Sequence, residues 1–403
     1  MDLLWHPSGW IRSSCLSLPD GEVGEKREAY VDLRGMSSVA LPGIIDMHVH
    51  LRGLQLSYKE DETSGTLAAL AGCVTGVVDM PNTRPHIRNA RTLREKLEAL
   101  RRGAKVDYGI YAGVPESVEE ARIMAAMPIA GFKIYPEDME REEVLCETFK
   151  AAEERGLLII VHSEHPEMIR VPDYGYDRDL FRNCPAEMMG VEEIRRLTRR
   201  CAASPKVHIT HVSCPRTVLM AKSYGYTVDV TPHHLIWHKH NFKSLCNPFC
   251  ESKVNPPLRG VAESWGLWQM IFDGVVDAVA SDHAPHAPYE KSWLPPEQCS
   301  PGFSSLESWP GALLLIFERL GLRDLYVEMT SLRVAKVLGI KRSLSLSVFS
   351  LEPEISPGSL RSKGKITPYL GVRRARCLAT VIRGKLISDE QESTGVNMFE
   401  NRG

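Results

Sequence analysis

Three polar residues at alternate positions, Asp46, His48 and His50, fall within the apolar segment 43–50. If this segment is a β-strand, residues two apart share a face, so the three side chains point the same way. Imidazole nitrogens and carboxylate oxygens are the ligands that zinc and similar divalent cations take in proteins. The pattern therefore indicates either a cation site or a group of hydrogen-bonded structural residues.

Other polar side chains stand at the ends of further short apolar segments. Lys133 lies near the end of IAGFKIY, and His162 ends LLIIVH. His211 ends VHITH, and Asp282 ends AVASD. Each of them alone has an ordinary structural interpretation, such as a hydrogen-bonded histidine, a salt-bridged lysine or a helix-capping aspartate. Together they favour a metal centre, because burying so many polar groups in one place costs free energy unless cations or hydrogen-bond partners are bound there.

The elements that would bring these residues together alternate along the chain. Apolar runs rich in Val and Ile alternate with amphipathic stretches, which is typical of βα units and a parallel sheet. Eight such runs predict a (β/α)8 barrel of the TIM type, whose active-site face is formed by the carboxyl ends of the strands. We expect strands at residues 43–50, 73–80, 107–113, 128–135, 157–162, 206–211, 227–231 and 275–282, and intervening helices that include 91–102, 141–155 and 186–201.

The two ends of the chain do not follow this alternation. Residues 375–387 have the pattern of strand, turn and strand, and the head of the chain ends in the strand-like segment 30–35. We expect residues 1–42 and 340–403 to form one small β-subdomain. The barrel, residues 43–339, would be inserted between its two parts.

Composition narrows the possible functions. The 403 residues carry a formal net charge of −2, so the chain lacks the excess of positive charge that would favour binding to nucleic acid or to an anionic membrane. The N-terminus lacks the pattern of a secretory signal, and no stretch approaches the roughly 18 apolar residues of a membrane span. We therefore expect a cytoplasmic protein. Free thiols are expected for its ten scattered cysteines, although a hyperthermophilic source would favour some disulfides.

A set of motifs in fixed order resembles the dihydroorotases, a family of cyclic amidohydrolases. The opening motif PGIIDMHVHLR ends at Arg52, and MPNT, GFKIY, TPHHL, NPPLR, SDHAPH and PGF follow in order. The similarity extends from about residue 31 to the C-terminal β-segment. The chain also departs from the family pattern. Many relatives have HLREPG where this chain has HLRGLQ at residues 50–55, and residues 136–141 lack the Thr-Phe pair that animal relatives carry on a mobile active-site loop. The first forty residues are only loosely similar.

The resemblance implies a site for two divalent cations, with zinc the expected metal. Lysine as an ammonium offers no lone pair, but addition of CO₂ to its neutral amine would give a carbamate that bridges the cations. Asp282 would also act as the catalytic acid and base. For Asp229, a structural role beneath the turn at Pro232 is favoured over a third metal site. The implied metal ligands are His48, His50, Lys133, His162, His211 and Asp282, and the implied substrate contacts are Arg52, Asn82, Asn255, His286 and Pro301.

The resemblance also implies the substrate. Dihydroorotate carries a ring carboxylate, which suits the guanidinium of Arg52. Taken singly, Arg52 could be a loop arginine and Asn82 a turn residue. Hydantoinases and dihydropyrimidinases share the metal set but usually lack this Arg and Asn combination. We therefore expect reversible hydrolysis of (S)-dihydroorotate to N-carbamoyl-L-aspartate in de novo pyrimidine synthesis.

Two alternatives remain at this point. One is another cyclic amidohydrolase, a hydantoinase or an allantoinase. The other is a non-catalytic scaffold that binds aspartate transcarbamoylase, although such proteins lose metal ligands and none is missing here. Expected partners are the small-molecule substrate and either a second copy of the chain or aspartate transcarbamoylase.

Overall fold

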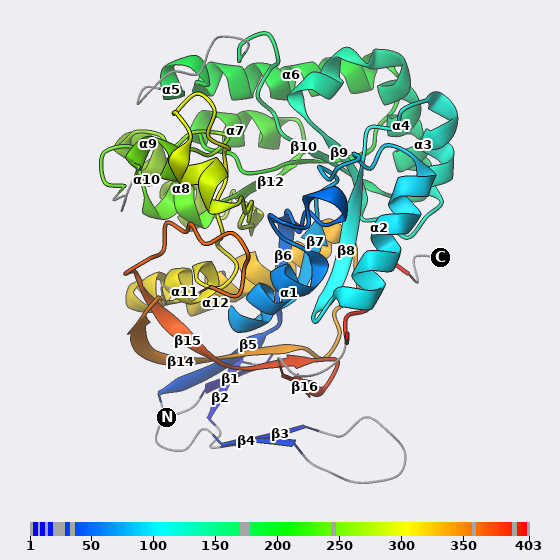
Figure 1. The fold of residues 1–403 in the computed structure, drawn as a ribbon. Helices are drawn as coiled ribbons and strands as arrows, with labels where there is room; N and C mark the ends of the chain where they lie inside the picture. Colours follow the sequence, from blue (N-terminus) through cyan, green and yellow to red (C-terminus); the bar gives the residue numbers. More distant parts are fainter. Residues whose placement is uncertain are drawn as a thin grey trace.

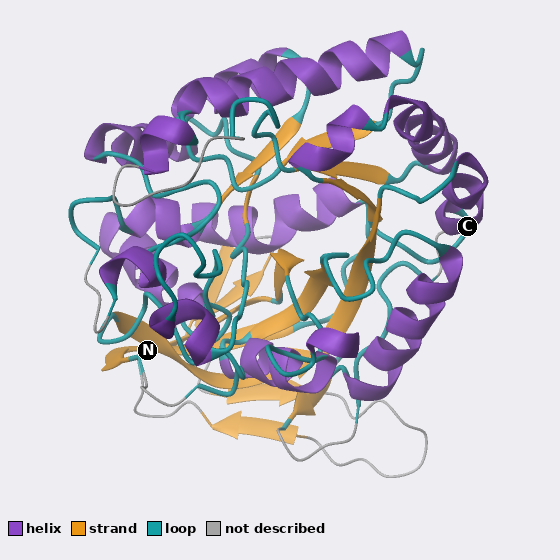
Figure 2. Cartoon of the chain, turned by 45° about the horizontal axis from the view of Figure 1, so that its top comes forward, coloured by secondary structure: helices purple, strands orange, loops and turns teal. Residues whose placement is uncertain are grey.

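The computed structural model describes residues 3–6, 9–12, 15–18, 29–32, 37–169, 178–242, 247–356, 360–388 and 393–400, with only the backbone for residues before 37. Eight parallel strands form its central sheet in the order β13-β12-β11-β10-β9-β8-β7-β6. A parallel bridge between Val49 and His283 joins the two edges, so the sheet is a nearly closed barrel (Figure 2). Its strands are β6 (Ile44–Val49), β7 (Val74–Asp79), β8 (Asp107–Gly113), β9 (Gly131–Ile134), β10 (Leu158–Val161), β11 (Lys206–Ile209), β12 (Thr227–Val230) and β13 (Ala278–Val279).

All eight expected barrel strands are confirmed. Helices cover the outside of the barrel and side chains fill the inside, so both faces of each strand are buried. In β7, Val77 and Val78 point to opposite faces, and both are fully buried. This double burial explains why the strands are continuous apolar runs in the sequence.

Helices surround the barrel (Figures 1 and 2). The expected helices at 91–102, 141–155 and 186–201 are confirmed as α2, α4 and α6. No helix among the described residues combines the length and the apolar character that a membrane span requires. The α-helices are α1 (Glu62–Ala71), α2 (Ala90–Gly103), α3 (Val118–Ala125), α4 (Glu142–Arg155), α5 (Arg178–Phe181), α6 (Cys184–Arg200), α7 (Pro215–Ser223), α8 (Pro232–Ile236), α9 (Pro248–Glu251), α10 (Val261–Phe272), α11 (Trp309–Leu320), α12 (Arg323–Val327) and α13 (Arg333–Leu338), and the short turns of 3-10 or π helix are η1 (Leu54–Leu56), η2 (Pro136–Glu140), η3 (Tyr289–Trp293) and η4 (Glu328–Leu332).

A second, six-stranded sheet lies beside the barrel and combines both ends of the chain (Figure 1). The expected C-terminal hairpin turns at Arg383 and Gly384, which both have positive φ, as a tight hairpin turn requires. In order along the sheet, its strands are β16 (Lys385–Ile387), β15 (Arg373–Ile382), β14 (Leu346–Ile355), β5 (Ser38–Pro42), β1 (Leu3–His6) and β2 (Gly9–Arg12).

The head of the chain also contains a separate hairpin. β3 (Cys15–Leu18) pairs with β4 (Ala29–Asp32) in a two-stranded sheet of its own. The strand-like segment expected at 30–35 is thus partly β4, and its residues 33–35 lie outside the described part of the chain.

The last described segment, 393–400, returns to the barrel. Asn397 forms a parallel bridge with Tyr108 at the start of β8, and Phe399 is buried against Gly109. This segment therefore packs on the barrel, and its Thr394 also accepts a hydrogen bond from Arg383 in the turn between β15 and β16. We propose that the small β-subdomain ends near residue 42 and resumes near residue 340. The last strand before the barrel, β5, pairs with the first strand after it, β14.

The expectation of free thiols is wrong for eight of the ten cysteines, which form four disulfides. Partners are 30 to 304 residues apart in the sequence, yet the fold brings the Cα atoms of each pair to between 4.9 and 5.8 Å. That separation is within the range that a disulfide spans. Sequence spacing could not reveal these pairs, because tertiary contacts create them. The disulfides are Cys73–Cys377, Cys146–Cys201, Cys184–Cys214 and Cys250–Cys299.

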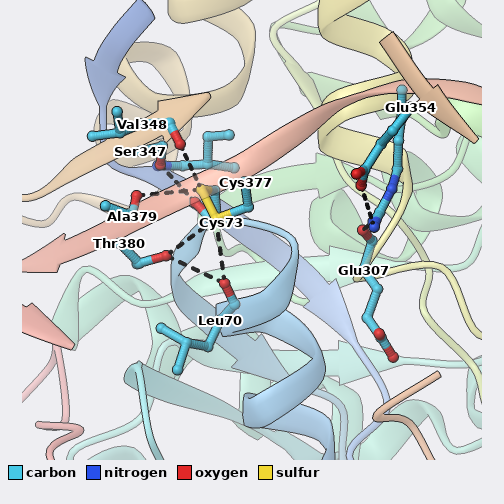
Figure 3. Close-up of a disulfide and its surroundings, with 11 residues drawn as sticks. Leu70, Cys73, Glu307, Ser347, Val348, Glu354, Cys377, Ala379 and Thr380 are labelled. Carbon is cyan, nitrogen blue, oxygen red and sulfur yellow. Dashed lines mark hydrogen bonds and ion pairs between the residues drawn. A yellow bond between two sulfur atoms is a disulfide. The ribbon is translucent and has the colours of Figure 1, made fainter. Parts of the chain in front are cut away.

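Cys73–Cys377 joins the barrel to the six-stranded sheet (Figure 3). Cys73 directly precedes β7, and Cys377 lies in β15. The sulfur of Cys73 lies 3.2 and 3.3 Å from the carbonyl oxygens of Val348 and Ala379. The bond therefore links the two units at a buried point of their junction.

Candidate active site

A cavity of about 250 Å³ lies at the carboxyl ends of the barrel strands. All six expected metal ligands line it, together with four of the five expected substrate contacts. The exception is His286, which lies one layer behind the cavity wall. The lining residues are His48, His50, Arg52, Asn82, Lys133, Tyr135, Pro136, Glu137, His162, Ile169, Arg182, His211, Asn255, Asp282, Ala284, Pro301 and Gly302.

His48, His50 and Asp282 form the tightest cluster in this cavity. Their ligand atoms all lie within 4.8 Å of one another. The Nε2 atoms of His50 and His48 are 3.0 and 3.3 Å from one carboxylate oxygen of Asp282. Burial lowers the pKa of both histidines, which favours the neutral rings.

The other nitrogen of each ring is held by a hydrogen bond. His50 Nδ1 lies 2.6 Å from Oδ1 of Asn82, an acceptor, so this nitrogen donates. Thr210 donates its hydroxyl to Asp229, so its oxygen accepts from His48 Nδ1 at 2.6 Å. Both Nε2 lone pairs therefore face the Asp282 carboxylate. Three acceptors that converge in this way fit a divalent cation.

Lys133 and His211 occupy the adjacent part of the cavity. The Nζ atom of Lys133 is fully buried and has no hydrogen-bond partner among the described residues. Burial lowers the pKa of Lys133 to about 7, against the attraction of Asp282 and Asp229. A substantial fraction of the amine is therefore neutral near pH 7. The ring centre of His211 lies 4.5 Å from that of His162 and 5.2 Å from that of His48.

His162 is held by two residues that the sequence analysis missed. Its Nε2 atom lies 2.6 Å from Glu164, which also accepts from Arg182. Burial alone would raise the pKa of Glu164, but Arg182 and His162 hold it well below its usual range. Glu164 is therefore ionised and accepts from Nε2 of His162, so the lone pair of Nδ1 is left for a cation.

Asp229 does not line the cavity. One of its oxygens lies 2.7 Å from Nε2 of His208 and accepts from Thr210, and the other accepts from the backbone N–H of His211 at 2.6 Å. These bonds support the structural interpretation of Asp229, since its oxygens are committed to positioning the strand ends.

Arg52 is a buried cation that also lines the cavity. Its side chain has no carboxylate within ion-pair distance among the described residues. Its Nε lies 3.4 Å from the carbonyl oxygen of Pro285, and its Nη2 lies 3.2 Å from Nε2 of His286. Such a buried, unpaired guanidinium is costly unless a ligand anion completes it.

Three of the seven described non-glycine residues with positive φ line this cavity. Arg52, His211 and Asp282 have φ values of 56°, 44° and 49°, in the left-handed region that side chains other than glycine rarely adopt. Each such conformation costs on the order of 1–3 kcal/mol and is typical of functional sites. Hydrogen bonds between strands, such as that from His211 N–H to Asp229, hold this backbone in place.

Tyr135 is a further lining residue that the sequence analysis missed. Its hydroxyl is buried and has no hydrogen-bond partner among the described residues. Tyr135 lies two residues after Lys133, so it shares the same face of the chain. This two-residue period was the signal that could have identified it.

Comparisons with known proteins place these features in a family. A family model described as dihydro-orotase-like matches residues 37–154. A dihydroorotase from Aeropyrum pernix is 49% identical over 400 residues, which cover 96% of this chain and 93% of that protein. A dihydroorotase from Saccharolobus solfataricus is 39% identical over 378 residues, which cover 91% and 89% of the two chains.

Solved structures show the same fold. An L-hydantoinase (dihydropyrimidinase) from Arthrobacter aurescens has a TM-score of 0.79 and 22% identity, covering 91% of this chain and 89% of that one. A dihydropyrimidinase from Brevibacillus agri also has a TM-score of 0.79, at 20% identity, covering 99% and 98%. At this identity the likeness concerns the fold alone.

Proposed function

The chain belongs to the dihydroorotase family of cyclic-amide hydrolases, and from that premise we propose that it interconverts (S)-dihydroorotate and N-carbamoyl-L-aspartate. The observation that carries this proposal is the unpaired, buried Arg52 in the same cavity as His48, His50 and Asp282. Dihydroorotate has a carboxylate on the ring that is to be opened. Its recognition therefore requires a cation close to the hydrolytic centre.

We propose two divalent cations, of which zinc best suits the donors, as the cofactor. His48, His50 and Asp282 would hold one, and His162 and His211 the other. The neutral amine of Lys133 would add CO₂ and release a proton, which gives a carbamate with two oxygens to bridge the cations. The buried, unpartnered Nζ of Lys133 supports this role. When bound, the cations would polarise the amide carbonyl and make water more acidic.

Asp282 would move the proton in this reaction. In ring opening, water adds to the amide carbonyl carbon, Asp282 accepts a proton from this water, and the C–N bond breaks. Asp282 then donates the proton to the departing ring nitrogen. In ring closure, the ureido nitrogen attacks the carboxyl carbon, water leaves, and Asp282 moves the proton in the opposite direction.

The remaining lining groups would orient the substrate. Arg52 and Asn82 would bind the ring carboxylate, and Asn255 and the backbone near Pro301 would contact the ring. Asn82 accepts from His50 through Oδ1, which leaves its amide N–H groups available as donors. Fixing the carboxylate and the ring in this way would raise the rate by positioning the amide for attack.

The proposed reaction belongs to de novo pyrimidine synthesis, in the cytoplasm. Disulfides occur in intracellular proteins of hyperthermophiles, so the four disulfides do not oppose this placement. We also propose assembly with a second copy of the chain or with aspartate transcarbamoylase, which would supply the substrate N-carbamoyl-L-aspartate.

A substrate panel tests the proposal. The purified protein should contain two divalent cations per chain and open dihydroorotate with kcat/KM far above its values for hydantoin, allantoin and dihydrouracil. Removal of the cations by a chelator should abolish turnover, and zinc should restore it. Faster turnover of hydantoin or allantoin would assign the chain to the alternative activity, and metal-free protein without turnover would support the scaffold.

A further inference from the structure

His286 is placed so that its two ring nitrogens have different partners. Its Nε2 lies 3.0 Å from the carbonyl oxygen of Pro301, which can only accept a hydrogen bond. Its Nδ1 lies 3.2 Å from Nζ of Lys59, which donates as an ammonium. This pair of partners favours the tautomer in which Nε2 carries the proton and Nδ1 accepts, whereas Nη2 of Arg52, a donor 3.2 Å from Nε2, favours the opposite tautomer.

The ring is neutral in this environment. Burial lowers the pKa of His286 to about 3; Glu290 acts against this shift, and the nearby charges of Arg52 and Lys59 act in the same direction as burial. Glu290 lies 3.8 Å from Nδ1, which is too far for a hydrogen bond. Lys59 at Nδ1 and the carbonyl oxygen of Pro301 at Nε2 thus act together to keep the proton on Nε2.

Lys59 is itself held in place. Its amine pairs with Glu290 at 2.9 Å, and both side chains are largely buried. Glu290, in η3, also accepts from the hydroxyl of Tyr58 at 2.9 Å and from the backbone N–H of Ala287 at 3.0 Å. The segment after Arg52 and the turn η3 therefore meet at one carboxylate.

The tautomer of His286 determines what Arg52 can do. Nη2 of Arg52 lies 3.2 Å from Nε2 of His286. When Nε2 carries the proton, it cannot accept, and the N–H groups of Nη2 are available to a ligand. In the other tautomer the lone pair of Nε2 would accept from Arg52, and the carbonyl of Pro301 would lose its donor.

We propose that Lys59 is a positioning residue for the substrate carboxylate, because it fixes the tautomer of His286 and so keeps the guanidinium of Arg52 free to bind. This inference rests on the proposed function and deepens it. Lys59 does not line the cavity and acts through His286 and Arg52.

Imidazole ¹⁵N NMR at pH 7 tests the tautomer directly, and the variant His286→Asn identifies the signals of this ring. The wild type should show Nε2–H, and Lys59→Met should shift the ring toward Nδ1–H. Lys59→Arg, which keeps a donor, should restore the wild-type signal. An unchanged Nε2–H signal in Lys59→Met would overturn the proposal.

Kinetics of the same variants test the consequence. Lys59→Met should raise KM for dihydroorotate about tenfold or more, with little change in kcat. A rise of this size corresponds to the loss of one charged hydrogen bond between Arg52 and the substrate carboxylate. The matched control Tyr58→Phe removes another contact of Glu290 and should leave KM unchanged. An equal rise of KM in both variants would show that Lys59 only holds Glu290 and the local structure in place, and this would refute the proposal. If the wild type does not turn over dihydroorotate, the proposed function fails, and the NMR spectra still decide whether Lys59 fixes His286.

Discussion

Lys133 shows how far burial changes the chemistry of one residue. In water its amine would be almost wholly protonated at pH 7 and unable to react with CO₂. In the barrel it is fully buried, and this burial lowers the pKa of Lys133 to about 7. The same side chain can therefore supply a neutral amine under ordinary conditions, which is the requirement for the proposed carbamate.

Replacing Lys133 by alanine should remove the proposed bridge between the cations. We expect the Lys133→Ala variant to lose most of its bound metal and its activity, with partial recovery when a small carboxylic acid such as acetate is added. Metal analysis of the purified variant measures the first effect. The control Lys291→Met, at another fully buried lysine outside the cavity lining, should keep its metal. Wild-type metal content in Lys133→Ala would contradict the assignment.

At the residue scale, the sequence predicted the groups that are unusual for their position. Histidines, a lysine and aspartates at the ends of apolar strands stand out, and all six expected metal ligands line the cavity. Glu164 and Arg182 did not stand out, because their role depends on an ion pair between residues 18 apart. His286 matched the family motif, but only the structure places it behind Arg52.

Several elements meet at the segment that carries Arg52. Lys96 of α2 is fully buried, and its amine pairs with Asp79 of β7 at 2.9 Å and with Glu62 of α1 at 2.5 Å. The same amine donates to the backbone carbonyl of Arg52 at 3.0 Å. At Gly53, with φ of 67°, an added Cβ would meet Glu62 at 2.1 Å. A side chain at position 53, such as the glutamate of HLREPG, would therefore collide with Glu62 of this ion-pair network.

The variant Lys96→Met should destabilise the protein strongly. It leaves the buried carboxylates of Asp79 and Glu62 without their cation, which costs about 3–5 kcal/mol in the free energy of unfolding. Denaturant unfolding measures this loss. The control Lys222→Met breaks the more exposed pair with Asp277 and should cost less than about 1 kcal/mol. Equal losses in the two variants would show that burial of the network is not what matters.

The expected strands and helices were predictable because their periods follow from burial on one or both faces. The connections were less so. The positive φ values of Arg52, His211 and Asp282 leave no mark in residue type, since none of them is glycine. Tertiary hydrogen bonds that no local pattern encodes hold the backbone of Arg52 and of His211.

At the scale of the whole molecule, the two ends of the chain are tied to the barrel. β1 and β5 share a sheet with β14 and β15, and Cys73–Cys377 connects this sheet to the barrel across 304 residues. A cross-link over so long a loop restricts the unfolded chain strongly. Single cysteines in a sequence do not reveal such a bond, which is why the prediction of free thiols failed.

Removing this disulfide should lower stability without affecting the site. We expect the double variant Cys73→Ser/Cys377→Ser to lose about 2–5 kcal/mol in the free energy of unfolding and to keep wild-type kcat/KM at 25 °C. Denaturant unfolding under oxidising conditions provides the measurement. The double variant Cys146→Ser/Cys201→Ser opens a loop of 55 residues and should lose about 1.5 kcal/mol less. A larger loss from the shorter loop would refute this entropic account.

The most direct test of the central claim compares two substrates in the wild type and in Arg52→Met. Dihydroorotate has the ring carboxylate that Arg52 is proposed to bind, and dihydrouracil lacks it. The variant should lose about 2–4 kcal/mol of transition-state stabilisation with dihydroorotate, which corresponds to one or more charged hydrogen bonds. With dihydrouracil it should lose little. Metal content should be unchanged, because Arg52 offers no ligand atom. The preference for dihydroorotate in kcat/KM should therefore fall by a factor of about 30 to 1,000, whereas an equal loss for both substrates would contradict the proposed function of this site.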